Sequence, residues 1–178
     1  MSRHRTTSLP VLEWSRSAVR LYDPATRKLT SADSLAGLGT LPREVVLALS
    51  RRTAFLRIVS MPAAKKEDLR AIAAIQLGNH FPVPAHELAY DLLPTEEAAP
   101  DGKKVLVAGV RQSDLRTALA LLKDAGTNVV KTLPTAMGSL YLVSGTGVVL
   151  ENTPEGVGID VVAGGVPQVS RLASPSGP

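Results

Sequence analysis

The sequence contains no cysteine, which excludes disulfides, thiol nucleophiles and metal sites built on thiolates. Aromatic residues are scarce, at 3% of 178 residues, so a hydrophobic core must consist mainly of Val, Leu, Ile and Ala. No apolar run approaches the roughly 20 residues that a membrane-spanning helix requires. The basic residues 1–5 are not followed by an apolar segment of the length found in secretory signals. Together these absences favour a cytoplasmic protein.

Charge is distributed unevenly along the chain, whose formal net charge is +4. Residues 1–70 carry 13 Lys and Arg against 6 Asp and Glu, whereas residues 71–178 carry 7 against 10. A basic half is compatible with an anionic partner such as nucleic acid. Because few aromatic side chains are present to stack on bases, we favour solvated surface charges and keep nucleic-acid binding as the weaker alternative.

Hydrophobic patterns indicate many short strands between two longer helices, which favours an α/β or α+β fold over a helical bundle. Alternation at residues 53–60 predicts a strand with one buried face. The polar, turn-rich residues 94–104 are expected to form an exposed loop. Strands are predicted at residues 9–12, 18–22, 28–30, 45–49, 53–60, 88–93, 103–110, 129–133, 147–150, 157–162 and 166–172.

Two segments have the period of amphipathic helices. The first spans residues 65–80 and is closed by Pro82, which cannot donate a backbone hydrogen bond. The second is expected to be N-capped by Ser113 and to end at Gly126. The positions predicted to face the core are Leu69, Ile72, Ala73 and Gln76, widened by Ala71 and Ile75, in the first helix, and Leu115, Ala118, Leu119 and Leu122 in the second.

The segment from residue 45 to 135 has a distinctive order of elements. One strand ends in Met61-Pro62, a helix closes with Phe81-Pro82-Val83-Pro84, and the next strand contains Tyr90-Asp91. A further helix ends in Ala125-Gly126, and a strand then leads to Leu133-Pro134. This order resembles the PilM/GspL group of actin-like proteins, in which the segment forms an inserted subdomain. The flanking residues 12–21 and 148–171 resemble the two phosphate-binding hairpins of that group.

The resemblance implies an α/β fold: an actin-like (ribonuclease-H-like) lobe that carries an inserted small α/β subdomain, with the second lobe truncated or reduced. Residues 1–44 would form the first part of the lobe, and residues 45–133 a strand pair plus the inserted subdomain. Residues 134–172 would form strands that begin the second lobe, and residues 173–178 a linker-like tail.

The resemblance also indicates where a competent family member binds nucleotide. Its first hairpin carries an Asp that organises metal-bound water and a Gly that lets the backbone approach phosphate; here Glu13 and Ser15 take these places. Its second hairpin carries Asp-x-Gly, and here Glu151 stands in that region. We therefore expect no catalytic residue, no metal and no cofactor, with binding of ATP and Mg²⁺ as the alternative. The degenerate nucleotide site would consist of Glu13, Ser15, Arg16, Ser17 and Glu151.

Two surface features are candidates for contact with a partner. Phe81, Pro82 and Pro84 form either a docking surface or a rigid corner of the subdomain, and we favour the corner. Arg51 and Arg52, at the tip of an expected hairpin, are predicted to be exposed charges available to an acidic protein face or to anionic lipid.

The function implied by the resemblance is that of a scaffold at the inner-membrane face of a bacterial cell, in type IV pilus assembly or type II secretion. Such a scaffold binds cytoplasmic segments of bitopic membrane proteins, a motor ATPase, or both, and a homodimer is a further expectation. It touches the membrane only indirectly and is not an enzyme. The alternative is a nucleotide-binding actin-like ATPase whose remaining lobe lies outside this chain.

Overall fold

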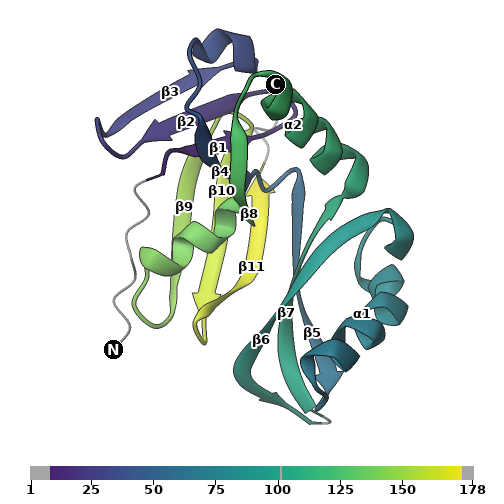
Figure 1. Ribbon diagram of the computed structural model, residues 1–178. Helices are drawn as coiled ribbons and strands as arrows, with labels where there is room; N and C mark the ends of the chain where they lie inside the picture. Colours follow the sequence, from purple (N-terminus) through teal and green to yellow (C-terminus); the bar gives the residue numbers. More distant parts are fainter. Residues whose placement is uncertain (1–8, 101, 174–178) are drawn as a thin grey trace, which may run out of the picture.

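The first sheet has five strands in the order β3-β2-β1-β4-β8. The structure is a computed structural model that describes residues 9–100 and 102–173 (Figure 1). Antiparallel pairing joins β1, β2 and β3, whereas β4 runs parallel to β1 and β8 runs parallel to β4. These strands are β1 (Val11–Trp14), β2 (Val19–Asp23), β3 (Lys28–Ala32), β4 (Glu44–Leu49) and β8 (Asn128–Pro134).

One face of this sheet is covered by helix α2 (Gln112–Asp124) and by the short 3-10 helix η1 (Leu35–Leu38). Their core joins Leu12 and Leu47 of the sheet to Ala118 and Leu122 of α2. The helix ends as predicted, because Gly126 adopts φ +76°, a left-handed conformation that favours glycine. The predicted N-cap is wrong: the helix already begins at Gln112 after Arg111, and no side chain caps it.

The insert between β4 and β8 has its own sheet, in the order β5-β7-β6, and its own helix. Leu69, Ala73 and Leu77 of the helix are buried against Val59 and Val105 of the sheet. The predicted widening of the helix face by Ala71 and Ile75 is wrong, because both are exposed, and Leu77 was missed. The elements are β5 (Ala54–Pro62), α1 (Lys66–His80), the 3-10 helix η2 (Ala85–Glu87), β6 (Leu88–Ala99) and β7 (Gly102–Arg111).

The loop predicted at residues 94–104 is instead the end of a long β-hairpin. Strand β6 continues to Ala99, and a register shift between Pro94 and Ala98 absorbs the residues that suggested a loop. Thr95 is buried there, and its hydroxyl donates to the carbonyl of Lys104 at 2.8 Å. A side-chain hydrogen bond therefore joins the strands where the ladder is interrupted.

Strands β4 and β5 do not form the predicted pair. β4 belongs to the first sheet and β5 to the sheet of the insert, so the turn at residues 50–53 links two sheets. β5 is also covered on both faces: Phe55 and Val59 pack toward α1, whereas Leu56 and Ile58 pack toward the third sheet. The single buried face predicted for this strand was therefore wrong.

The third sheet is an antiparallel meander in the order β11-β10-β9. It is formed by β9 (Gly147–Thr153), β10 (Gly156–Ala163) and β11 (Val166–Ala173), and the 3-10 helix η3 (Thr135–Tyr141) precedes it. Val166 joins Leu56 and Leu106 of the insert and Ala136 of η3 in a small core. The predicted tail after residue 173 lies outside the described residues.

Candidate functional site

The two hairpins assigned to a nucleotide site meet where the first and third sheets come together. Glu13 on β1 forms an ion pair with Arg20 on β2. The same guanidinium donates from Nη2 to Glu151 Oε1 on β9 at 2.7 Å. The structure therefore brings together Glu13 and Glu151, the two carboxylates predicted from the sequence, through Arg20.

Arg51 extends this arrangement into a chain of ion pairs. Its Nη1 lies 2.6 Å from Glu151 Oε2, and its Nε and Nη2 donate to the two oxygens of Asp160 at 3.0 and 2.5 Å. Ser139 of η3 donates to the same carboxylate at 2.5 Å. We call Glu13, Arg20, Glu151, Arg51 and Asp160 the ion-pair ladder.

The predicted exposure of Arg51 is wrong. Its side chain is 3% exposed and that of Asp160 is 0% exposed, so Arg51 is an internal cation. The cause is that the turn after β4 is enclosed by the third sheet, which is distant in sequence. Gly158 on β10 makes room for it, since a Cβ there would lie 2.7 Å from Arg51 Nη1. Sequence reasoning missed Asp160, Arg20 and Ser139; the acid within the apolar strand 157–162 was the available signal.

Burial and pairing set the protonation of the ladder. Burial acts to raise the pKa values of Glu151 and Asp160, but hydrogen bonds from the guanidiniums outweigh it, so both pKa values lie below the ordinary ones. Burial raises the pKa of Glu13, although Arg20 partly offsets this effect. Three carboxylates thus share two guanidiniums, and Glu13 is the carboxylate that takes up a proton most easily.

The space between the two hairpins is too small for a phosphate group. A cavity of about 10 Å³ remains there, lined by Glu13, Ser15, Ala18, Arg20, Thr153, Pro154 and Glu155. Holding even one water requires roughly 10–15 Å³. In this conformation the ladder and the hairpins leave little space between them.

The backbone amides of both hairpins are also engaged within the chain. Ser15 Oγ accepts hydrogen bonds from the N–H groups of Ser17 and Ala18 and donates to the carbonyl of Ala18. In the second hairpin, Thr153 Oγ1 accepts from the N–H of Glu155 and donates to the carbonyl of Gly156. A hydroxyl therefore takes donors that a phosphate would otherwise use.

The remaining residues of the predicted nucleotide site, Arg16 and Ser17, have partners outside the ladder. Arg16 Nη2 lies 2.8 Å from Asp114 Oδ2 and ties the first hairpin to α2. Ser17 Oγ donates to Glu155 at 3.2 Å, and Arg52 lies 3.8 Å from the same carboxylate. These contacts join the first hairpin and the β4–β5 turn to the second hairpin.

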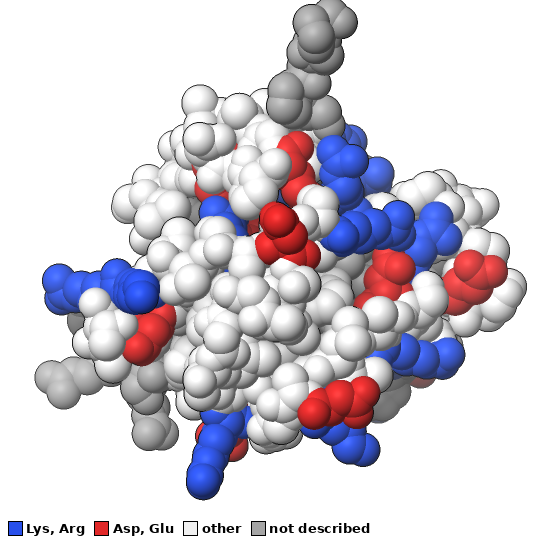
Figure 2. All heavy atoms as spheres, turned by 90° about the horizontal axis from the view of Figure 1, so that it is seen from above, with Lys and Arg blue, Asp and Glu red and all other residues white. Residues whose placement is uncertain are grey.

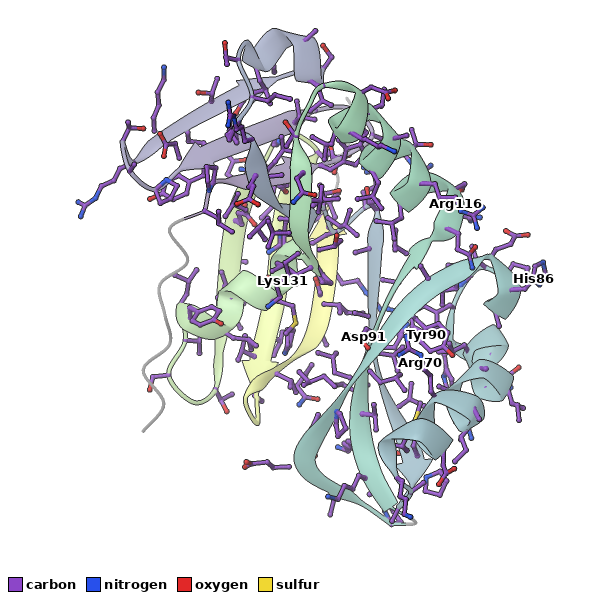
Figure 3. The ribbon with its side chains drawn as sticks, viewed as in Figure 1. Arg70, His86, Tyr90, Asp91, Arg116 and Lys131 are labelled. Carbon is purple, nitrogen blue, oxygen red and sulfur yellow. The ribbon has the colours of Figure 1, made fainter. Side chains whose placement is uncertain are left out.

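At the predicted corner of the insert, one of the three residues is buried and two are exposed. Phe81 is in the core and contacts Phe55 edge to face, with 6.2 Å between ring centroids, so its ring does not offer a docking surface. Pro82 and Pro84 are exposed. Nearby, the Tyr90 hydroxyl donates to the carbonyl of Arg70 at 3.2 Å, and the Arg70 guanidinium donates to the carbonyl of Tyr90 (Figure 3). These two bonds fasten α1 to β6.

Several basic residues of the first part of the chain pair with acids from the later part. Arg16 pairs with Asp114, Arg20 with Glu151, and Arg51 with Asp160. Figure 2 shows Lys and Arg interspersed with Asp and Glu on the face seen from above. Part of the uneven charge along the sequence therefore reflects pairing within the fold.

No protein-family model matches the sequence, and no curated protein matches it. Among solved structures, a chain of the PilM-PilN type IV pilus biogenesis complex matches with a TM-score of 0.74 at 20% identity, over 97% of this chain and 63% of that one. The cytoplasmic domain of EpsL, an inner-membrane component of the type II secretion system of Vibrio cholerae, matches with a TM-score of 0.70 at 14% identity, over 93% of this chain and 70% of that one.

These likenesses define the class of fold. The predicted α/β, actin-like architecture with an inserted subdomain is confirmed by both structures. The chain spans 63% of the length of the matched pilus-complex chain. Among residues 9–100 and 102–173, no helix is long and apolar enough to cross a membrane.

Proposed function

We propose that the protein is a scaffold of an inner-membrane type IV pilus assembly or type II secretion platform, and that it binds partners without turning over nucleotide. In this role it holds the cytoplasmic segment of a bitopic membrane protein, a motor ATPase, or both. The ion-pair ladder is the observation that supports the absence of nucleotide turnover. The actin-like framework is present, but guanidiniums already neutralise the carboxylates between its hairpins.

The scaffold half of the proposal is supported by the two structures that share the fold. One is a chain of a complex named for PilM and PilN, and the other is a cytoplasmic domain of an inner-membrane secretion component. A fold shared at 14–20% identity does not transfer partners by itself, so the partner requires its own experiment.

The nucleotide half is tested by titrating the protein with ATP and Mg²⁺ in a calorimeter while the fluorescence of Trp14, the single tryptophan, is recorded. We expect no heat of binding and no change in emission at millimolar nucleotide, because the residual cavity is about 10 Å³. Micromolar binding would instead support the actin-like ATPase alternative.

The partner half is tested by co-expression with the cytoplasmic segments of single-span pilus and secretion proteins of the source organism, and separately with its motor ATPases. Retention of one such segment or ATPase on the tagged protein, and its loss at a competing excess of untagged protein, is the expected result. Retention of none of them, at low and moderate salt, would contradict the scaffold role.

A further inference from the structure

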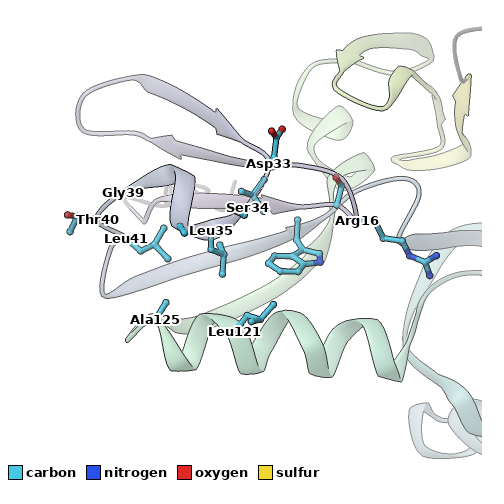
Figure 4. A pocket seen from close by; sticks show the side chains of 13 residues that line it. Arg16, Asp33, Ser34, Leu35, Gly39, Thr40, Leu41, Leu121 and Ala125 are labelled. Carbon is cyan, nitrogen blue, oxygen red and sulfur yellow. The ribbon is translucent and has the colours of Figure 1, made fainter.

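A groove lies on the first sheet, away from the ion-pair ladder. It runs between η1 and the C-terminal half of α2 (Figure 4), and Trp14 of β1 contributes to its lining. Its volume is about 680 Å³, within the range of roughly 300–1,000 Å³ typical of ligand pockets. It is lined by Trp14, Ser15, Arg16, Val19, Asp33, Ser34, Leu35, Ala36, Gly39, Thr40, Leu41, Leu121 and Ala125.

The groove exists because little chain covers this part of the sheet. Between β3 and β4 the only helix is the four-residue turn η1, so α2 has no helical neighbour of its own length there. Leu121 of α2 lines the groove and is 45% exposed. Large side chains that lie half-covered beside one another mark a surface suited to an apolar partner.

Several polar groups around the groove have no partner among the described residues. The indole N–H of Trp14 has no acceptor there, and the hydroxyls of Ser34 and Thr40 form no hydrogen bond there. Asp33 on the rim forms no ion pair within the described chain. Tryptophan N–H groups usually find an acceptor when they are covered, so an occupant would have to supply one.

Two features give the groove negative charge, a carboxylate on its rim and a helix C-terminus. Figure 4 shows Arg16 at one end and Thr40, Leu41 and Ala125 at the other, with Asp33 on the rim between them. Ala125 is the C-cap of α2, where the helix dipole contributes partial negative charge. Arg16 is already paired with Asp114 at 2.8 Å, so Asp33 and this helix end are the features that favour basic groups in an occupant.

We propose that this groove binds an amphipathic α-helix from the cytoplasmic segment of a partner membrane protein. The apolar face of that helix packs on Trp14, Leu35 and Leu121, with basic residues toward Asp33. Segments next to the membrane on the cytoplasmic side are enriched in Lys and Arg, which matches the charge of Asp33. The proposal rests on the scaffold function and specifies where the scaffold holds its partner.

The test uses overlapping synthetic peptides of 15–20 residues (about four to five and a half helical turns) that span the cytoplasmic segments of single-span membrane proteins of the source organism. Binding to the full chain is measured by peptide array and then in solution by the emission of Trp14. Three variants are compared with the wild type: Leu121→Gln, Asp33→Lys and Leu119→Gln. Leu119 also lies on α2 and is 36% exposed but does not line the groove, so it is the matched control.

We expect a binding peptide with apolar residues at helical spacing to shift Trp14 emission to shorter wavelength. Leu121→Gln should weaken binding at least about tenfold and Asp33→Lys several-fold, whereas Leu119→Gln should leave the affinity within about twofold. Retention of wild-type affinity by Leu121→Gln, with no change in Trp14 emission, would overturn the groove as the binding site while leaving the scaffold function in place.

Two further outcomes would also overturn the proposal. If no peptide binds but full-length partners are retained, the scaffold function stands and the groove is not its helix site. If Leu121→Gln abolishes self-association seen for the wild type by analytical ultracentrifugation, the occupant is a second copy of the chain. Failure of both peptides and full-length partners would instead contradict the scaffold function itself.

Discussion

The side chain of Arg51 lies in a space that only a glycine on the neighbouring strand leaves open. Its guanidinium contacts both oxygens of Asp160 and one oxygen of Glu151, and 3% of the side chain is exposed. Removing one partner of such a buried pair typically costs about 3–5 kcal/mol, because the other charge is left without compensation. The position of Arg51 is therefore sensitive to small changes in the surrounding backbone.

Gly158→Ala tests this sensitivity. The added Cβ would lie 2.7 Å from Arg51 Nη1 and 2.8 Å from its Cζ, and the paired guanidinium has little room to retreat. We expect the free energy of unfolding to fall by about 1–3 kcal/mol in urea denaturation followed by Trp14 fluorescence. Gly138→Ala is the control, because a Cβ there meets no atom within 4 Å; equal losses in both variants would contradict the argument.

At the scale of elements, the insert depends on one face of α1. Leu77 is fully buried in the core of the insert, whereas Ile75, two residues earlier on the same helix, is 84% exposed. Leu77→Ala should lower the free energy of unfolding by about 2–5 kcal/mol, since it leaves a cavity. Ile75→Ala should change it by no more than about 0.5 kcal/mol. Comparable losses in the two variants would place the core of the insert on the wrong face of α1.

Sequence periodicity located both helices and most strands, but it could not choose between neighbouring apolar positions. Ile75 and Leu77 are equally apolar, and which of them is buried depends on the sheet that α1 meets. Pro94 suggested a loop because a register shift within its own strand, between Pro94 and Ala98, is not visible in the sequence. Glu13 and Glu151 could be anticipated from the resemblance of their hairpins to those of the PilM/GspL group. Arg51 could not, because its carboxylate partners lie about a hundred residues away.

At the scale of the whole molecule, the ion-pair ladder joins the first sheet, the β4–β5 turn and the third sheet. Its members come from β1, β2, β9 and β10 as well as that turn. The ladder connects these parts of the fold across their junction. Protonation of the ladder should therefore affect the stability of the entire molecule.

The sign of the pH effect follows from the pKa directions. The folded-state pKa values of Glu151 and Asp160 lie below the ordinary 4.5 and 3.8, so their stabilisation is present above these values and is lost as the pH falls further. The pKa of Glu13 is raised above 4.5, so it acts in the opposite sense and partly offsets the loss. We expect the free energy of unfolding to decrease as the pH falls from 4.5 toward 2.5.

The variant Glu151→Gln tests how much of the pH dependence of the free energy of unfolding comes from the ion-pair ladder. Urea unfolding at a series of pH values should give a shallower decline below pH 4.5 than in the wild type, since one carboxylate with a lowered pKa is gone. Glu97→Gln removes one side of a partly exposed pair with Lys104, and such pairs contribute little. An unchanged slope in Glu151→Gln would show that the acid sensitivity arises outside the ladder.

The interruption of the first sheet by the insert has a consequence for synthesis on the ribosome. β4 is made early, but its neighbour β8 follows only after all of β5, α1, β6, β7 and α2. The insert has a core of its own and can close while the first sheet still presents an unpaired edge at β4. A nascent chain stalled just after β7 would thus hold a finished insert beside an unfinished sheet, and only the emergence of β8 would protect that edge.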